Sequence, residues 1–132
     1  MIVVDASVLT NALTDDGPIG QLSRSSLAED PQWTGPEHLI VETFSAIRGR
    51  LLGRKISEQR AREAIEAIAG VEIGMLPVVR LLPRMWELRN AIGGSDAAYV
   101  ASAEIDECAL LTADVRLARA AESYCDVHLC LP

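Results

Sequence analysis

The stretch that decides the fold is GGSDAAYVASAEIDECALLTADVRLARA, residues 93–120. Its apolar pattern predicts a helix capped near Ser95, a short apolar strand over residues 109–112 and a second helix. Asp96 lies in the first turn of the first helix, and Asp114 directly follows the strand. Both aspartates suit helix N-termini as caps. An acid that follows a parallel strand also lies at the carboxyl edge of the sheet, where α/β folds bind ligands.

Short apolar runs alternate with helical patterns along the rest of the chain. Further strands are expected at residues 2–4, 32–34, 71–73 and 127–129, and further helices at 6–13, 18–28, 36–52, 57–70 and 77–89. There is no repeat or linker. We therefore predict one domain over residues 1–132, an α/β fold of three layers with a short, mainly parallel central sheet flanked by helices.

The charge of the chain is acidic overall but uneven. The formal net charge is −7, which argues against wrapping of nucleic acid over the whole surface. Six of the twelve basic residues nevertheless fall within residues 48–62. This segment is either a solvated helix face or a local contact for a polyanion. The candidate RNA contacts are Arg48, Arg50, Arg54 and Lys55.

Composition also bears on compartment and assembly. No apolar run approaches the ~18 residues that span a bilayer, and the N-terminus MIVVDAS lacks the basic start of a secretion signal. The three cysteines show no metal-binding spacing with the two histidines. We expect a cytoplasmic protein with no membrane partner. Because 49% of this small chain is hydrophobic, a homodimer or another partner is also expected.

Two more acids, Asp5 and Glu42, lie at positions where a carboxylate needs a cation or a proton beside it. Asp5 follows the apolar run Ile2–Val4, and Glu42 lies within LIVETFSAI, a predicted helix interior with apolar neighbours. An unpaired buried carboxylate costs several kcal/mol, so each needs a cation or a proton. His38, four residues before Glu42, is one alternative partner, and an arginine from elsewhere is another.

The four acids suggest a metal site if the strands before Asp5 and Asp114 are neighbours. These two side chains would then meet at one edge of the sheet, with Asp96 arriving from the preceding helix. Clustered carboxylates raise one another's pKa values. A Mg²⁺ or Mn²⁺ ion, which prefers oxygen ligands, would relieve that repulsion. Such an ion can also activate water for attack on a phosphodiester.

At these positions the chain resembles the PIN-domain nucleases, and most of all the VapC-type toxins of toxin–antitoxin systems. The resemblance rests on Asp5 in VVDASVL, Glu42 in the helix after Pro36, Asp96 in SDAAYVASAE and Asp114 in LLTADVRLA. It covers essentially the whole chain. Some PIN proteins carry another acid two residues after the last one, whereas this chain has Arg116 there, which places a complete second metal site in doubt.

The resemblance implies a PIN fold and an endoribonuclease that depends on Mg²⁺ or Mn²⁺. It implies that Asp5, Glu42, Asp96 and Asp114 are both the catalytic and the metal-binding residues, with Ser7 and Thr112 in support. It further implies a homodimer, inhibition by a cognate VapB-like antitoxin, and transfer or ribosomal RNA as candidate substrates. The sequence does not specify the RNA, the bond cut or the number of metal ions.

Other functions fit the sequence less well. A receiver-type signalling domain would need paired acids after the first strand and a lysine after a late strand, but the chain has one Asp5 and a single lysine, Lys55. A dinucleotide-binding module would need G-x-G-x-x-G, and a serine hydrolase G-x-S-x-G; neither is present. A catalytically silent PIN-like interaction module is the remaining alternative, which the four intact acids oppose.

Overall fold

The computed structural model describes all residues 1–132 as five strands and seven helices. The strands are β1 (Ile2–Val4), β2 (Trp33–Pro36), β3 (Ile73–Leu76), β4 (Ala109–Thr112) and β5 (Val127–Leu129). The helices are α1 (Ala6–Thr14), α2 (Pro18–Ala28), α3 (Leu39–Leu52), α4 (Glu58–Ala69), α5 (Val78–Glu87), α6 (Gly94–Ile105) and α7 (Val115–Ala121).

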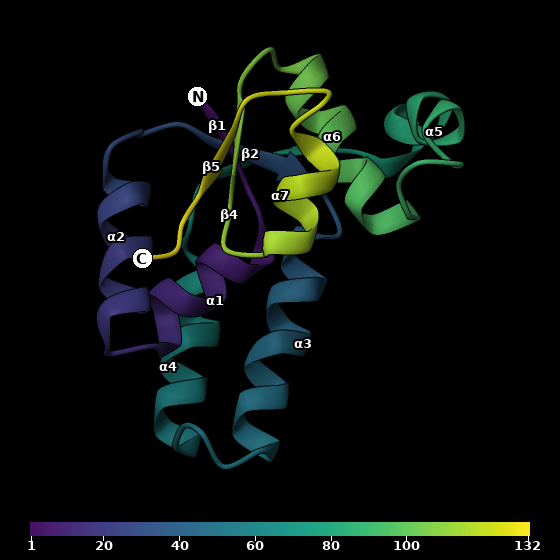
Figure 1. Ribbon diagram of the computed structural model, residues 1–132. Coiled ribbons are helices and arrows are strands. Elements are labelled where there is room, and N and C mark those ends of the chain that lie inside the picture. The colour runs from purple at the N-terminus through teal and green to yellow at the C-terminus, as the bar shows by residue number, and fades with distance from the viewer.

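All strand pairs in the single sheet are parallel, in the order β3-β2-β1-β4-β5. The chain moves from β1 outward to β3 and then returns to β4. Because crossovers between parallel strands are right-handed, α1 to α4 lie on one face of the sheet and α5 to α7 on the other (Figure 1). This arrangement confirms the predicted three-layer α/β fold.

The pairing of β1 with β4 places the expected acids at one edge. Val4 is in register with Leu111, and the Asp5 amide donates to the Leu111 carbonyl at 3.0 Å. Val3, Val4, Leu110 and Leu111 are almost fully buried, as the apolar runs predict. The residues that directly follow these two strands therefore emerge side by side at the carboxyl edge of the sheet.

Helix α6 is buried through most of its length and packs on β1, β2 and β4. Its residues Ala97 to Ala103 are all buried, and their small side chains allow the helix to lie close to the sheet. Tyr99 is the one large residue among them, at 1% exposure. Helix α6 therefore holds Asp96 and Tyr99 rigidly beside the strand ends.

Several expected boundaries are wrong. Pro36 ends β2 instead of beginning α3, because it is still in register with Leu76 of β3 and the next amide, that of Glu37, donates to the Leu76 carbonyl at 2.9 Å. Helix α6 begins at Gly94 after Gly93, so Ser95 is inside the first turn and is not the N-cap. Strand β3 begins at Ile73 and runs to Leu76, later than expected. None of the helices is long and apolar enough to cross a membrane.

Candidate active site

Asp5 is the most buried acid of the predicted set, at 7% exposure. The hydroxyl groups of Ser7 and Thr112 both donate to its Oδ2, at 2.5 and 2.8 Å. Burial raises the pKa of Asp5 above its ordinary value, and these two hydrogen bonds oppose that rise. The negative charges of Glu42 and Asp114 raise the pKa further. Asp5 is therefore a fixed, desolvated carboxylate that a cation would stabilise.

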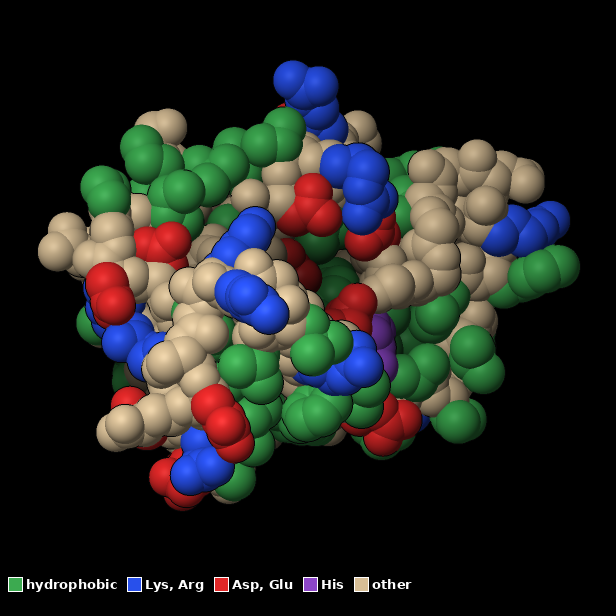
Figure 2. All heavy atoms as spheres, turned by 90° about the horizontal axis from the view of Figure 1, so that it is seen from below, with side chains coloured by type: hydrophobic (Ala, Val, Ile, Leu, Met, Phe, Trp, Pro, Cys, Tyr) green, Lys and Arg blue, Asp and Glu red, His purple; other side chains and the backbone are tan.

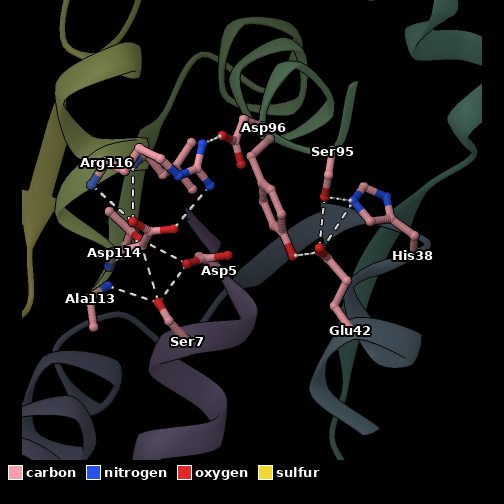
Figure 3. Close-up of polar contacts among 12 residues, drawn as sticks. Asp5, Ser7, His38, Glu42, Ser95, Asp96, Ala113, Asp114 and Arg116 are labelled. Atoms are coloured by element: carbon pink, nitrogen blue, oxygen red, sulfur yellow. Dashed lines mark hydrogen bonds and ion pairs between the residues drawn. The ribbon is translucent and has the colours of Figure 1, made fainter. Parts of the chain in front are cut away.

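Backbone amides after β4 hold the two hydroxyl groups in place. The Ala113 amide donates to Ser7 Oγ at 2.9 Å, and the Asp114 amide donates to Thr112 Oγ1 at 3.0 Å. Each hydroxyl thus accepts from the backbone and donates to Asp5 (Figure 3). Ser7 and Thr112 orient the Asp5 carboxylate.

Asp114 caps α7, one of the two roles that its position suggested. Its Oδ1 accepts from the amides of Arg116 and Leu117, at 2.9 and 3.3 Å. Its other oxygen, Oδ2, lies 3.4 Å from the Arg116 guanidinium. One oxygen of Asp114 therefore caps α7, and the other turns toward the carboxyl edge of the sheet. We call this edge, which carries Asp5, Asp96 and Asp114, the acidic edge.

Asp96 is buried and turns toward the same guanidinium. Its side chain is 12% exposed, and its Oδ2 accepts from Arg116 Nη1, its only hydrogen-bond or ion-pair partner (Figure 3). Asp96 and Asp114 are thereby joined through one arginine. No three Asp, Glu, His or Cys side chains are close enough together to bind one ion. The expected convergence of three or four carboxylates within a few Å is therefore wrong in this structure, because the guanidinium lies between two of them.

Glu42 lies near Tyr99, which is also close enough to Asp5 for the charges of both acids to raise the pKa of its hydroxyl. The Tyr99 hydroxyl donates to its Oε1 at 2.6 Å, and the Ser95 hydroxyl to its Oε2 at 2.7 Å. His38 Nε2 lies 3.2 Å from Oε1, which confirms the alternative partner that the sequence suggested. These contacts with His38, Tyr99 and Ser95 outweigh burial and lower the pKa of Glu42 to about 2. Glu42 is ionised at neutral pH.

The expected apolar surroundings of Glu42 are not found. Its side chain is 36% exposed, and its neighbours Val41 and Phe44 are 64% and 50% exposed. Only Leu39, Thr43 and Ile47 of α3 are buried, so the buried stripe of this helix passes beside Glu42. The sequence run looked continuous because its exposed positions also carry large apolar residues.

The predicted RNA contacts lie away from these acids. Helix α3 begins beside the acidic edge and runs outward (Figure 1). Its last residue, Leu52, is about 15 Å farther along the helix axis than Glu42, and Arg54 and Lys55 follow that end. Arg50 donates to Thr14 and Asn11 at 2.6 Å each and thus ties α3 to α1. Arg48, Arg54 and Lys55 have no side-chain hydrogen bond or ion pair with the rest of the chain.

Sequence reasoning missed two residues of this site. The sequence prediction does not single out Tyr99, although a buried tyrosine usually needs a partner for its hydroxyl. It treats Arg116 only as the position of a missing acid. The face that holds these groups is hollowed, with acidic side chains inside and basic side chains at the rim (Figure 2).

The chemistry of the donor set suits a hard divalent cation, although its carboxylates are not close enough together to bind one ion while the Arg116 guanidinium contacts Asp96 and Asp114. The set consists of the carboxylates of Asp5, Asp96 and Asp114, all oxygen donors of the kind that Mg²⁺ and Mn²⁺ prefer. The buried Asp5, whose pKa is raised, and the buried Asp96, whose one partner is a cation, both call for positive charge at this edge. Glu42 already has three hydrogen-bonding partners, so it does not need a cation beside it.

Amide substitutions should separate the two kinds of carboxylate by their effect on stability. The lowered pKa of Glu42 means that its charge stabilises the fold above about pH 4.5, and that this contribution is lost as the pH falls toward about 2. The raised pKa of Asp5 means that its charge destabilises the fold at neutral pH, a penalty that disappears below its ordinary pKa of 3.8.

We therefore expect Glu42→Gln to melt below the parent at pH 7 and Asp5→Asn to melt no lower than the parent. Both differences should shrink in acid. Thermal unfolding followed by circular dichroism between pH 2.5 and 7.5, in chelator, measures this. An Asp5→Asn variant that melts clearly below the parent at pH 7 would show that Asp5 is a stabilising, paired carboxylate.

The comparisons with known proteins agree with this geometry. The family model described as PIN domain matches residues 2–123. Ribonuclease VapC9 and ribonuclease VapC1 of Mycobacterium tuberculosis are each 35% identical to the chain over 128 residues, which is 96% of the chain and 96% of each relative.

Solved structures with the same fold include Mycobacterium tuberculosis VapC20, described as a sarcin–ricin loop cleaving toxin. Its TM-score is 0.63 at 18% identity, over 83% of this chain and 87% of that one. VapBC-1 from nontypeable Haemophilus influenzae has a TM-score of 0.59 at 15% identity, over 98% of each chain. From the family match and the curated relatives, the chain belongs to the PIN domain family and, within it, to the VapC ribonucleases.

Proposed function

We propose that the chain is an endoribonuclease toxin that cleaves RNA with a divalent cation, Mg²⁺ or Mn²⁺, held at the acidic edge. The observation that carries this proposal is the pair of buried aspartates at that edge, Asp5 and Asp96, whose charges both act on the Arg116 guanidinium. The names of the curated relatives support a ribonuclease. A silent interaction module would not need this set of oriented carboxylates, and a receiver domain would need a second acid after the first strand and a lysine after a late strand, which the chain lacks.

Asp5, Asp96 and Asp114 would hold the cation, with Ser7 and Thr112 fixing the orientation of Asp5. When bound, the cation would lower the pKa of a water molecule and neutralise charge on the phosphodiester. Glu42 would accept a hydrogen bond from water beside Tyr99, since its low pKa keeps it ionised. We propose the cytoplasm as the site of the reaction. The free state of Cys108, Cys125 and Cys130 agrees with a reducing compartment.

Cleavage of RNA should require both the cation and the aspartates. A labelled transfer RNA and a ribosomal RNA fragment, incubated with the chain and Mn²⁺, should be cut, and chelator should stop the reaction. Loss of a group that only orients a metal ligand typically costs about 10- to 100-fold. Loss of a ligand itself, in Asp5→Asn or Asp96→Asn, should therefore lower the rate at least about 100-fold.

Asp126→Asn is the matched control, because Asp126 is exposed and precedes β5 at the opposite edge of the sheet. It should cleave at the parent rate. Cutting that survives exhaustive chelation, or that Asp96→Asn leaves unchanged, would refute the proposed chemistry. Sequencing of the fragments would identify the RNA and the bond.

We also propose that a VapB-like antitoxin covers the site. One of the structures with this fold is described as VapBC-1. A groove of about 260 Å³ lies between α3 and α4, lined by Phe44, Ile47, Leu51 and Ile65 among others. Leu39 is fully buried, so the exposed apolar surface of α3 begins at Val41 and Phe44. An amphipathic peptide in this groove could continue along α3 to the acids and present an arginine there.

Phe44→Ser should therefore weaken the complex with the antitoxin by about 30-fold or more, the usual loss for an aromatic anchor at the centre of an interface. The antitoxin to use is the product of an antitoxin-like reading frame that adjoins the gene for this chain, where the genome carries one. Ile105→Ser, an exposed apolar residue at the end of α6, is the control and should bind as the parent does. Equal affinities of the two variants, measured by calorimetry, would place the antitoxin elsewhere.

We also propose that the chain forms a homodimer through the exposed face of α5. Val79, Leu82 and Trp86 are 74%, 50% and 67% exposed, and their spacing places them on one outer stripe of the helix. The inner stripe, with Leu81 fully buried, already packs on α6. An apolar stripe that remains exposed beyond the packed one is typical of an interface.

The parent should have twice the 14.2 kDa mass of one chain in light scattering at micromolar concentration. A charge at the centre of the stripe, as in Leu82→Glu, should give a folded monomer, because the symmetric contact would bury two like charges. Ile105→Glu should remain dimeric. A dimeric Leu82→Glu would exclude α5 as the interface.

A further inference from the structure

Arg116 occupies an unusual place for an exposed residue. It lies at the second position of α7, and its side chain is 71% exposed. Its guanidinium nevertheless turns back over the acidic edge, where Nη1 donates to Asp96 Oδ2 and Nη2 lies 3.4 Å from Asp114 Oδ2 (Figure 3). One flexible side chain thus joins carboxylates from two segments that are 18 residues apart in sequence.

For Asp96 this arginine is the only partner. The Asp96 side chain is 12% exposed and has no hydrogen bond to any other group. A carboxylate with so little access to water needs a cation beside it. Asp5, by contrast, has two hydroxyl donors, and Asp114 has two backbone amides. The guanidinium therefore supplies the positive charge that the geometry of Asp96 demands.

We propose that Arg116 is a resident counter-ion that competes with the divalent cation for Asp96 and Asp114. This inference rests on the proposed function, since it takes the metal to bind these same carboxylates. The guanidinium occupies Oδ2 of Asp96 and faces Oδ2 of Asp114, so a metal ion that takes these two oxygens must displace it. Arg116 then raises the concentration of divalent cation that is needed to fill the site.

The two partners of this ion pair differ in their freedom to move. Asp96 is fixed in the first turn of the buried helix α6, whereas the Arg116 side chain is 71% exposed. Water and salt reach the Arg116 end of the ion pair and weaken it by screening. A divalent cation carries twice the charge and approaches the oxygens more closely, so it can displace the guanidinium.

Mn²⁺ binding to the full chain can be measured without RNA, by calorimetry and by the paramagnetic resonance signal of free Mn²⁺. Arg116→Gln should bind Mn²⁺ roughly three- to tenfold more tightly than the parent, the factor expected from removing one or two exposed ion pairs. Arg116→Lys should lie between the two, because a point charge does not bridge two carboxylates as a planar fork does.

Arg119→Gln is the matched control. It removes the same charge from the same helix, at an exposed arginine with no contact to the acids, and corrects for the general effect of net charge. Its affinity should stay within about twofold of the parent. Circular dichroism of each variant verifies that it is folded.

The outcomes separate this inference from the function on which it rests. If Arg116→Gln binds Mn²⁺ no more tightly than Arg119→Gln, while Asp96→Asn abolishes binding, the metal site stands and the counter-ion is refuted. If neither the parent nor Arg116→Gln binds Mn²⁺, the metal site itself is refuted, and the competition with it.

Discussion

The parallel pairing of β1 with β4 is the constraint on which the site depends. It places the residue after Val4 next to the residues after Leu111, so that Thr112 and Ser7 both reach the Asp5 carboxylate. Without that register, Asp5 would be a buried acid without donors. The same pairing fixes the start of α7 and with it Asp114 and Arg116. A few hydrogen bonds at one edge of the sheet thus organise residues from both ends of the chain.

The acids at this edge are stabilised in three different ways. Asp5 is held by hydroxyl groups, Asp96 by a guanidinium, and Glu42 by a tyrosine, a serine and a histidine. These differences matter for function. A carboxylate that depends on a movable cation can exchange it for another cation, whereas one with fixed neutral donors keeps its position throughout. The acidic edge therefore combines a rigid part, around Asp5, with an exchangeable part, around Asp96.

Much of this arrangement follows from the sequence, and the reasons for the rest are physical. The apolar runs before Asp5 and Asp114 predict their strands, because buried parallel strands are apolar throughout. The partners of Glu42 were harder to predict: Tyr99 and Ser95 come from a helix more than fifty residues away, and no local pattern reports that contact. The ion pair of Arg116 could not be predicted, because a long exposed side chain adopts many rotamers and sequence spacing does not select one. Exposed Val41 and Phe44 misled the prediction for α3, since hydrophobicity alone does not separate a core stripe from a binding surface.

The central claim is that the aspartates at this edge bind a divalent cation. The most direct measurement is anomalous diffraction from crystals of the chain grown with Mn²⁺. The account predicts an anomalous peak in contact with Asp5, Asp96 and Asp114, with the Arg116 guanidinium turned away from Asp96. A peak at another place, or no peak while Arg116 remains paired with Asp96 at saturating Mn²⁺, would contradict it.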